Sequence, residues 1–199
     1  MTLNENKSPL YALILCGGYS KRMKTDKFSI SYHDNTPQWL YLFNLLRPLV
    51  ENTFLSCRKD QISLFEEHYP IIIDGIDGDG PSVGLISAHL KHPDAAWLVI
   101  ACDLPLLTDK TLRELISSRN IHKSATSFIS PINNLPEPLI AIWEPRALHL
   151  LKENFEAGLN CPRKTLLNTT IELLTSSSPL EQMNANTPED RDDALKILG

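Results

Sequence analysis

Residues 11–18 read YALILCGG, a short run of apolar side chains that stops at two glycines. A continuous apolar run of this length, bounded by a turn signal, is typical of a strand buried on both faces. Such strands belong to parallel sheets, whose two sides are covered by helices. The segment therefore predicts a central parallel strand, and in open α/β sheets ligands bind beyond the carboxyl ends of such strands.

The rest of the chain alternates between strand and helix patterns. Further strands are expected at residues 53–57, 71–73, 96–102, 125–129, 139–143 and 171–174. Helices are expected at residues 38–50, 60–68, 83–91, 108–118, 145–156 and 187–198, while residues 166–170 are ambiguous. Thr108 and Thr187 are the expected N-caps of two of these helices. The alternation predicts an α/β protein with a mainly parallel sheet, in one domain over residues 1–199.

The composition and net charge argue against some classes of binding partner. The chain has 199 residues, a formal net charge of -5 and 42% apolar residues. An acidic chain is a poor candidate for nucleic acid, whose binding depends on many contacts between Lys or Arg and phosphate. No apolar run reaches the roughly 18 to 20 residues that span a bilayer, and the polar start lacks the core of a signal peptide. We therefore expect a cytoplasmic protein that binds neither nucleic acid nor membrane.

The four cysteines and six histidines show no metal-binding pattern. Cys16, Cys57, Cys102 and Cys161 are far apart and form no CxxC pair. In an intracellular protein this pattern favours reduced, mostly packed thiols over disulfides. The histidines lack the spacing of a zinc site, so neither residue type indicates metal chemistry.

The loop after the first strand combines glycines with cations. Gly17 and Gly18 let the backbone approach a ligand closely, and successive N–H groups can then face an anion. The residues that follow supply a hydroxyl and positive charge: Ser20, Lys21, Arg22, Lys24 and Lys27. Neither GxxxxGK[ST] nor GxGxxG is present. We interpret this loop as a site for the phosphates of a nucleoside triphosphate, with a plain basic loop as the alternative.

Two further strands end in a carboxylate. Asp74 follows the apolar residues 71–73 and could accept two N–H bonds from guanine, although an Asx-turn is the alternative. Asp103 follows the apolar residues 96–102, where a lone carboxylate is costly without a partner. Mg²⁺ is a suitable partner because it takes one or two protein carboxylates together with phosphate oxygens and water. A helix cap or an ion pair is the alternative role for Asp103.

The pattern L-C-G-G-x-S-x-R-M-x-x-D-K at residues 15–27 resembles the N-terminal signature of the molybdenum cofactor guanylyltransferase family, L-A-G-G-x-S-x-R-M-G-x-D-K. The resemblance continues in GPSVG at residues 80–84, CDLP at 102–105 and NANTPED at 184–190. It implies the three-layer Rossmann-like fold of nucleotidyltransferases. Lys24 and Cys16 depart from the family pattern, which has Gly and Ala at these two positions.

The resemblance also implies roles for individual residues. The nucleotide contacts would come from Leu15, Cys16, Gly17, Gly18, Ser20 and Lys27. Arg22 would lie on the phosphates, Asp74 on guanine or ribose, and Asp103 on Mg²⁺, so that Arg22, Lys27 and Asp103 form the catalytic set. Asn184 and Asn186 would bind the acceptor phosphate or a metal-bound water, with helix capping as the alternative.

The acceptor side is marked more weakly. Residues 135–143 resemble the family's Pro-rich strand that leads to the acceptor, although a core strand explains them equally well. Arg163 and Lys164 could bind an acidic acceptor such as a pterin phosphate, or could be an exposed basic pair.

The activity implied by the resemblance is the Mg²⁺-dependent transfer of GMP from GTP to molybdenum-molybdopterin, with release of pyrophosphate. The partners would be GTP, a molybdopterin-type phosphate acceptor and, transiently, the proteins that insert or receive the cofactor. A CTP-using enzyme, a nucleotidyltransferase for a sugar or alcohol phosphate, and a non-catalytic nucleotide or cofactor carrier remain as alternatives. The missing GxGxxG argues against a dinucleotide-dependent oxidoreductase.

Overall fold

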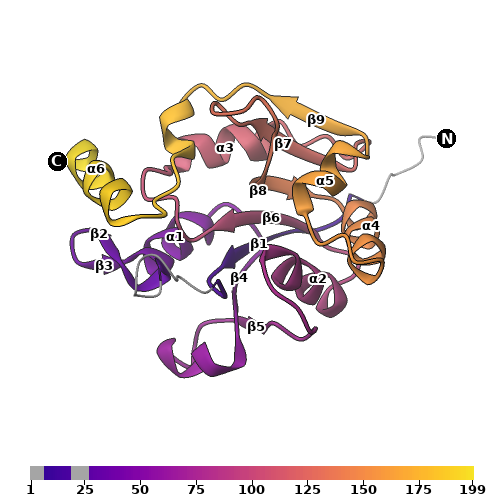
Figure 1. Ribbon diagram of the computed structural model, residues 1–199, viewed down its shortest axis with the longest axis horizontal. Helices are drawn as coiled ribbons and strands as arrows, with labels where there is room; N and C mark the ends of the chain where they lie inside the picture. The colour runs from indigo at the N-terminus through magenta and orange to yellow at the C-terminus, as the bar shows by residue number, and fades with distance from the viewer. Residues whose placement is uncertain (1–6, 19–26) are drawn as a thin grey trace.

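The computed structural model describes residues 7–18 and 27–199, and its centre is a seven-stranded sheet of order β5-β4-β1-β6-β8-β7-β9. β1 (Leu10–Leu15) lies inside the sheet between β4 (Asn52–Cys57) and β6 (Ala96–Ala101), and pairs in parallel with both. This arrangement confirms the central parallel strand predicted from residues 11–18 (Figure 1).

One strand runs against the others. β8 (Pro136–Trp143) pairs antiparallel with β6 and with β7 (Ala125–Ile129). β5 (Ile71–Ile73) and β9 (Ile171–Leu174) are parallel to their neighbours β4 and β7 and form the two edges of the sheet. Because β8 is reversed, its first residues lie at the same edge of the sheet as the last residues of β6.

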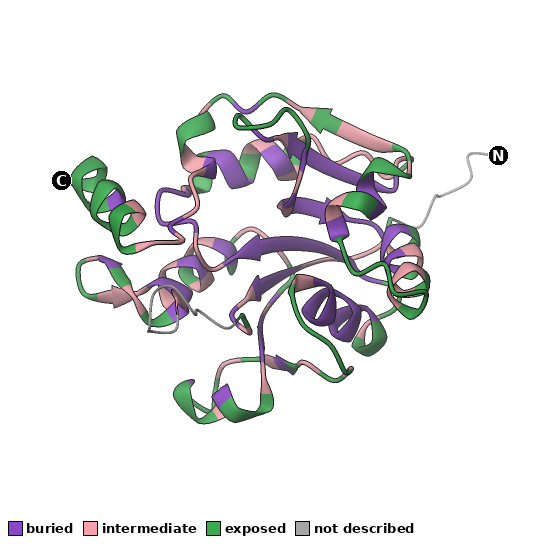
Figure 2. Cartoon of the chain, viewed as in Figure 1, coloured by how far each residue is buried: buried purple, intermediate pink, exposed green. Residues whose placement is uncertain are grey.

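Helices cover both faces of the sheet, which confirms the predicted three-layer α/β fold. α1 (Gln38–Leu46) and α3 (Asp109–Ser117) pack on one face. α2 (Pro81–Lys91), α4 (Pro145–Glu156) and α5 (Pro162–Leu167) pack on the other. The central strands between the layers are mostly buried, whereas the edge strand β9 is intermediate to exposed, as Figure 2 shows. Each fully buried large apolar side chain stabilises the fold by about 1.5–3 kcal/mol.

Gly84 allows α2 to lie close to the sheet. A Cβ atom at this position would be 2.5 Å from Ser56 Oγ and 2.8 Å from Leu15 Cδ2. Pro81 stands at the first helical position, where its missing N–H is not needed. The absence of a side chain at Gly84 therefore allows a close approach of helix to strand.

The structure corrects several predicted boundaries. Residues 60–68 are not an α-helix, since the 3₁₀ helix η2 (Lys59–Leu64) spans the short connection from β4 to β5. The helix expected over residues 38–50 already ends at Leu46, because Pro48 has no N–H to continue the helical hydrogen bonds. The ambiguous residues 166–170 include the last turn of α5.

A small hairpin was not predicted. After the 3₁₀ helix η1 (Lys27–Ser29), β2 (Ser31–His33) pairs antiparallel with β3 (Thr36–Pro37). Asp34 and Asn35 form its turn with φ of 43° and 58°. Asp and Asn tolerate this left-handed conformation, so the Asp-Asn pair is the signal that predicts such a turn.

The C-terminal helix α6 (Pro188–Leu198) begins at the predicted cap. The Asp190 N–H donates to the Thr187 hydroxyl at 3.2 Å, and the Thr187 N–H donates to the Asp190 carboxylate at 2.9 Å. Buried Ala194 joins Tyr32 and Leu106 in a small cluster, which holds α6 against the hairpin (Figure 1).

Thr108 stands at the N-cap position of α3, as predicted, but its side chain accepts no hydrogen bond from that helix. Its hydroxyl and its N–H both donate to Glu181, each at 2.8 Å, so Thr108 ties the C-terminal segment to the start of α3.

None of the helices in the part of the chain that the structure describes has the length and apolar character needed to cross a bilayer.

Candidate nucleotide and phosphate-acceptor site

A cavity of about 330 Å³ opens at the carboxyl edge of the parallel strands, where sequence reasoning expects a ligand. It brings together predicted residues from four separate segments: Leu15, Cys16, Gly17, Gly18, Lys27, Asp74 and Asp103. Ser20 and Arg22, the other predicted residues of the first loop, lie outside the described residues, as does Lys24.

The strand register places the polar side chains of the site in one line. Leu15 pairs with Ser56 of β4 and with Ala101 of β6. Residues two further along a strand share the same face, so Gly17, Arg58 and Asp103 come next to one another. The pairing of Cys57 with Ile73 likewise brings Asp74 next to Arg58, and the Asp74 N–H donates to Cys57 O at 2.9 Å.

The same line extends to the reversed strand β8. β6 and β8 pair Val99 with Ala141 and Ile100 with Ile140, so Glu137, near the start of β8, lies at the edge of the sheet where β6 ends. Burial and, to a smaller extent, the negative charge of Asp103 raise the pKa of Glu137. We call the line formed by Asp74, Arg58, Gly17, Asp103 and Glu137 the edge row. It crosses β5, β4, β1, β6 and β8 in that order.

Asp103 is the centre of a polar network. Its Oδ2 accepts from Lys27 Nζ at 3.1 Å, and its Oδ1 accepts from Asn184 Nδ2 at 3.0 Å. Lys27 Nζ also donates to Asn186 Oδ1, and the Ala185 N–H donates to Asp103 O at 2.8 Å. These bonds bring Asn184 and Asn186 to the site from the C-terminal segment, and they give the Asp103 carboxylate an ion-pair partner.

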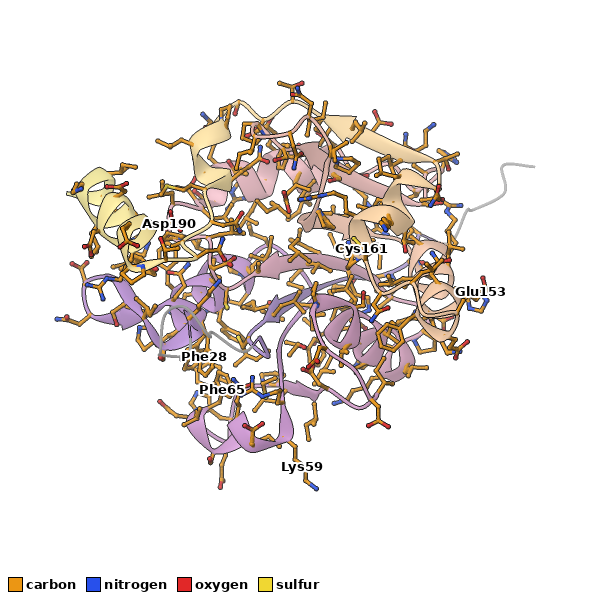
Figure 3. The ribbon with its side chains drawn as sticks, viewed as in Figure 1. Phe28, Lys59, Phe65, Glu153, Cys161 and Asp190 are labelled. Atoms are coloured by element: carbon orange, nitrogen blue, oxygen red, sulfur yellow. The ribbon has the colours of Figure 1, made fainter. Side chains whose placement is uncertain are left out.

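Phe28 anchors Lys27 over the cavity. The Phe28 side chain is 2% exposed and stacks on Phe65 with ring centroids 5.0 Å apart. Figure 3 shows the two labelled residues close to each other. Trp39 packs edge-on against the same Phe65 ring at 5.3 Å. Because Phe28 is fixed in the core, the neighbouring Lys27 is held where its amine reaches Asp103.

Gly17 makes room for the Asp74 carboxylate. Ser56 Oγ donates to Asp74 Oδ1 at 2.8 Å, and a Cβ atom on Gly17 would lie 2.5 Å from Asp74 Oδ2. Burial raises the pKa of Asp74, while the Ser56 hydroxyl and the nearby Arg58 act in the opposite direction. The carboxylate therefore occupies a partly desolvated position directly against the glycine loop.

Arg58 is a site residue that sequence reasoning missed. Its guanidinium donates to the Asp60 carboxylate through Nε at 3.1 Å and Nη2 at 3.3 Å, and through Nη1 to Gly17 O. In a planar trans peptide the C=O and N–H point in opposite directions, so this bond turns the Gly18 N–H away from Arg58. A basic residue directly after a strand end was the available signal.

Cys16 lines the cavity although its side chain is buried. Cys16 is 1% exposed, and burial, with Cys102 and Cys57 nearby, raises its thiol pKa well above the ordinary value. Its side chain packs in the core, so its main chain alone can reach a nucleotide. All four cysteines are thiols, as expected.

The donor set around Asp103 suits a magnesium ion shared with phosphates. Within residues 7–18 and 27–199 no cluster of three or more His, Cys, Asp or Glu side chains could hold a metal by itself. Mg²⁺ needs only one or two protein carboxylates when phosphate oxygens and waters complete its shell. Asp103 supplies one carboxylate in the cavity; the Asn184 amide nitrogen donates to it, and the Asn186 amide oxygen lies nearby as an acceptor of Lys27.

The sequence matches known nucleotidyltransferases over most of its length. The profile of the MobA-like NTP transferase domain family matches residues 12–185. A molybdenum cofactor biosynthesis bifunctional protein of Synechocystis sp. is 33% identical over 93% of this chain, which spans 53% of that relative. A molybdenum cofactor guanylyltransferase of Pseudomonas putida is 28% identical over 91% of this chain and 95% of its own length.

A solved structure has the same fold. The crystal structure of molybdopterin-guanine dinucleotide biosynthesis protein A from Archaeoglobus fulgidus superimposes with a TM-score of 0.79. It covers 94% of this chain and 98% of its own chain, at 20% sequence identity. Its likeness supports the fold, and the sequence profile supports the family. The resemblance seen in residues 15–27 is thereby confirmed, and the chain belongs to the family of MobA-like NTP transferase domains.

Proposed function

We propose that this protein transfers GMP from GTP to the terminal phosphate of a molybdopterin-type acceptor. The observation that carries the proposal is the contact between Lys27 and Asp103, which faces the cavity lined by Gly17, Gly18 and Asp74. This contact places a cation and a potential metal ligand beside a loop suited to phosphates. The relatives named as molybdenum cofactor guanylyltransferases support this acceptor and this nucleotide.

In this proposal the nucleotide lies along the first half of the edge row. The Gly18 N–H and the main chain at Leu15 and Cys16 face the triphosphate and sugar. Asp74 accepts N–H groups from guanine with the carboxylate oxygen that faces Gly17. Base contacts of this type select a nucleotide because an unpaired buried polar group is costly.

The reaction moves one phosphoryl centre between two oxygens. An oxygen of the acceptor phosphate bonds to the α-phosphorus of GTP, and the bond from that phosphorus to the bridging oxygen breaks, so that pyrophosphate leaves. A phosphate monoester has a second pKa near 6, so the nucleophile is already deprotonated at neutral pH and no general base is needed. Positioning and charge stabilisation are then the main contributions of the protein.

The chain's own residues supply this stabilisation. Lys27, released from Asp103 by the incoming phosphates, neutralises the charge on the leaving group, and Arg22 is assigned to the same phosphates. Asp103 would hold Mg²⁺, which would supply positive charge to offset that of the phosphates. Asn186, bonded to Lys27, keeps the amine at the phosphates while its partner changes.

The proposal is tested with the purified full chain, molybdenum-molybdopterin, Mg²⁺ and labelled GTP. We expect pyrophosphate release that requires both substrates, together with a labelled dinucleotide product. A parallel reaction with CTP measures base choice. Binding of GTP that raises the melting temperature without any pyrophosphate release would indicate a carrier and would contradict the enzymatic proposal.

A further inference from the structure

Two side chains bind the backbone directly after Asp103. Gln38 Nε2 donates to Leu104 O at 3.0 Å. His33 Nε2 lies 2.8 Å from Pro105 O, and because a carbonyl oxygen only accepts, the His33 ring donates through this nitrogen. The two carbonyl groups that follow Asp103 are therefore both bound by side chains from outside the loop.

A third side chain, that of Tyr41, completes the arrangement. Its hydroxyl donates to Leu107 O at 3.0 Å. Its ring stacks on that of His33, with centroids 3.7 Å apart and an interplanar angle of 10°. We call His33, Gln38 and Tyr41 the carbonyl clamp. The clamp comes from β2 and α1, and all three of its bonds go to residues 104–107.

Residues 104–107 depend on donors from outside the loop. They are buried between β6 and α3, in neither a helix nor a strand. Within the loop, the Leu107 N–H donates to Leu104 O, at a long 3.4 Å. Buried carbonyl groups need partners, and a loop without its own hydrogen-bond ladder takes them from side chains. Loss of an outside donor should therefore loosen the backbone directly after Asp103.

The clamp also joins the two members of the Lys27–Asp103 contact. Lys27 opens η1, which leads into the β2–β3 hairpin, and the Gln38 N–H donates to Ile30 O at 2.8 Å. The segment that carries Lys27 thus also holds the loop that follows Asp103. The 3.1 Å between Lys27 Nζ and Asp103 Oδ2 is set by this one segment on both sides.

We propose that the carbonyl clamp positions the Asp103 carboxylate against Lys27 for nucleotidyl transfer. The kinetic part of this inference rests on the proposed function, whereas the hold on the loop does not. His33, Gln38 and Tyr41 are positioning residues, since none of them is among the described residues that line the cavity. They act through Asp103 and exchange no proton with a substrate.

Other bonds keep the loop in place when one clamp donor is removed. The Ala185 N–H donates to Asp103 O at 2.8 Å. Glu181 accepts from the N–H and from the hydroxyl of Thr108, each at 2.8 Å. A single clamp variant should therefore remain folded while the Asp103 carboxylate loses its fixed position.

The first test uses two replacements of His33 in the full chain. His33→Phe keeps a ring to stack on Tyr41 and removes the N–H, whereas His33→Gln restores a donor. We expect His33→Phe to lower the kcat of pyrophosphate release by about 10-fold to 100-fold, the range expected for a misplaced catalytic group. Its Kd for GTP, measured without divalent metal, should be unchanged. His33→Gln should recover most of the lost kcat, and His149→Phe, on the exposed face of α4, should match the wild type.

A double-mutant cycle shows whether the clamp acts through Asp103. In the Asp103→Asn background, His33→Phe should lower kcat by less than about 2-fold, because the carboxylate that it positions is gone. A residue that only stabilises the fold would lower kcat by the same factor in both backgrounds. Tyr41→Phe, which removes one hydroxyl, should show the same pattern with a smaller loss and replaces His33→Phe if that variant does not fold.

Amide hydrogen exchange tests the hold on the loop without any turnover. His33→Phe should speed exchange in the peptide of residues 103–108 by at least about 10-fold, while the peptide of β4 keeps its wild-type rate. Unchanged exchange at residues 103–108, or an equal loss of kcat in both backgrounds, would overturn the inference. Missing pyrophosphate release by the wild-type protein would instead contradict the proposed function, and the exchange rates would then decide whether the clamp holds the loop.

Discussion

Each end of the edge row has an acidic residue and an arginine, but the hydrogen bonds of these residues differ between the two ends. At the nucleotide end, Arg58 bonds to Asp60 and to the Gly17 carbonyl, while Asp74 receives its direct hydrogen bond from the neutral Ser56 hydroxyl. At the opposite end, on β8, Arg163 donates directly to the Glu137 carboxylate. Burial raises the pKa of both acids.

The two acidic side chains are therefore held in place in different ways. Asp74 stands against a backbone loop, so its place depends on the absence of a side chain at Gly17. Glu137 and Arg163 come from a strand and a helix, and their ion pair fixes both. We therefore expect the position of Asp74 to depend on the loop at Gly17, and the position of Glu137 to depend on its ion pair with Arg163. Asp103 lies between them and should affect both substrates.

The largest effect is expected for Asp103→Asn. This change removes the partner of Lys27 and the carboxylate proposed to hold Mg²⁺, so kcat/KM should fall by about 100-fold to 1,000-fold, for GTP and for the acceptor alike. Pyrophosphate release gives the rates, and the melting temperature reports the fold. Asp193→Asn, which removes the same charge from the exposed face of α6, should leave activity unchanged. Wild-type activity of Asp103→Asn would remove Asp103 from the catalytic set.

Gly17→Ala should have an intermediate effect that is confined to the nucleotide end. The new methyl group would meet Asp74 Oδ2 at 2.5 Å, so the carboxylate has to move away from the base. We expect the KM for GTP to rise by about 10-fold to 100-fold, the cost of one charge-assisted hydrogen bond, with the KM for the acceptor unchanged.

Gly75→Ala is the matched control for this prediction. Gly75 directly follows Asp74, and a Cβ there would meet only Ile73 O, at an ordinary contact distance of 3.6 Å, so the same change at this position should be tolerated. Equal kinetic effects of the two alanine variants would show that the contact with Asp74 does not govern nucleotide binding.

Local sequence patterns predicted which residues follow the ends of strands, whereas contacts that depend on the order and direction of strands could not be predicted from them. Gly17, Asp74 and Asp103 each follow an apolar strand, so they could be assigned to one edge of the sheet without a structure. Glu137 could not be assigned to the edge where Asp103 lies, because its place there depends on the reversal of β8, which no local pattern predicts. Lys27 and Asn186 are 159 residues apart, and their assignment to one site followed from the family resemblance alone.

Secondary structure shows the same division. Residues 71–73 and 125–129 were predicted as strands with their observed bounds, and for 71–73 the continuous apolar run suffices as the signal. Residues 60–68 were wrongly predicted as α-helical, because the link from β4 to β5 forms the 3₁₀ helix η2 instead. Arg58, directly before η2, was missed because its role depends on Gly17, 41 residues earlier.

The smallest effect concerns stability and separates the two acids. The folded-state pKa of Asp74 lies above the ordinary value because of burial, so folding favours its neutral form. This contribution is fully present below pH 4 and is lost as the pH rises through the raised pKa. Asp74→Asn keeps a neutral acceptor for Ser56 and should raise the melting temperature at pH 7 by about 1–2 °C, with no gain near pH 3.5.

Glu137→Gln should not show this gain, although the pKa of Glu137 is also raised. Replacing the carboxylate leaves the Arg163 guanidinium without its charged partner, and removing one member of a partly buried pair is destabilising. Melting curves of the two variants at pH 3.5 and pH 7 make the comparison directly. A gain at pH 7 for both variants would mean that each acid stands alone in the folded protein, and that the direct pairing of Glu137 with Arg163 does not distinguish the two ends of the row.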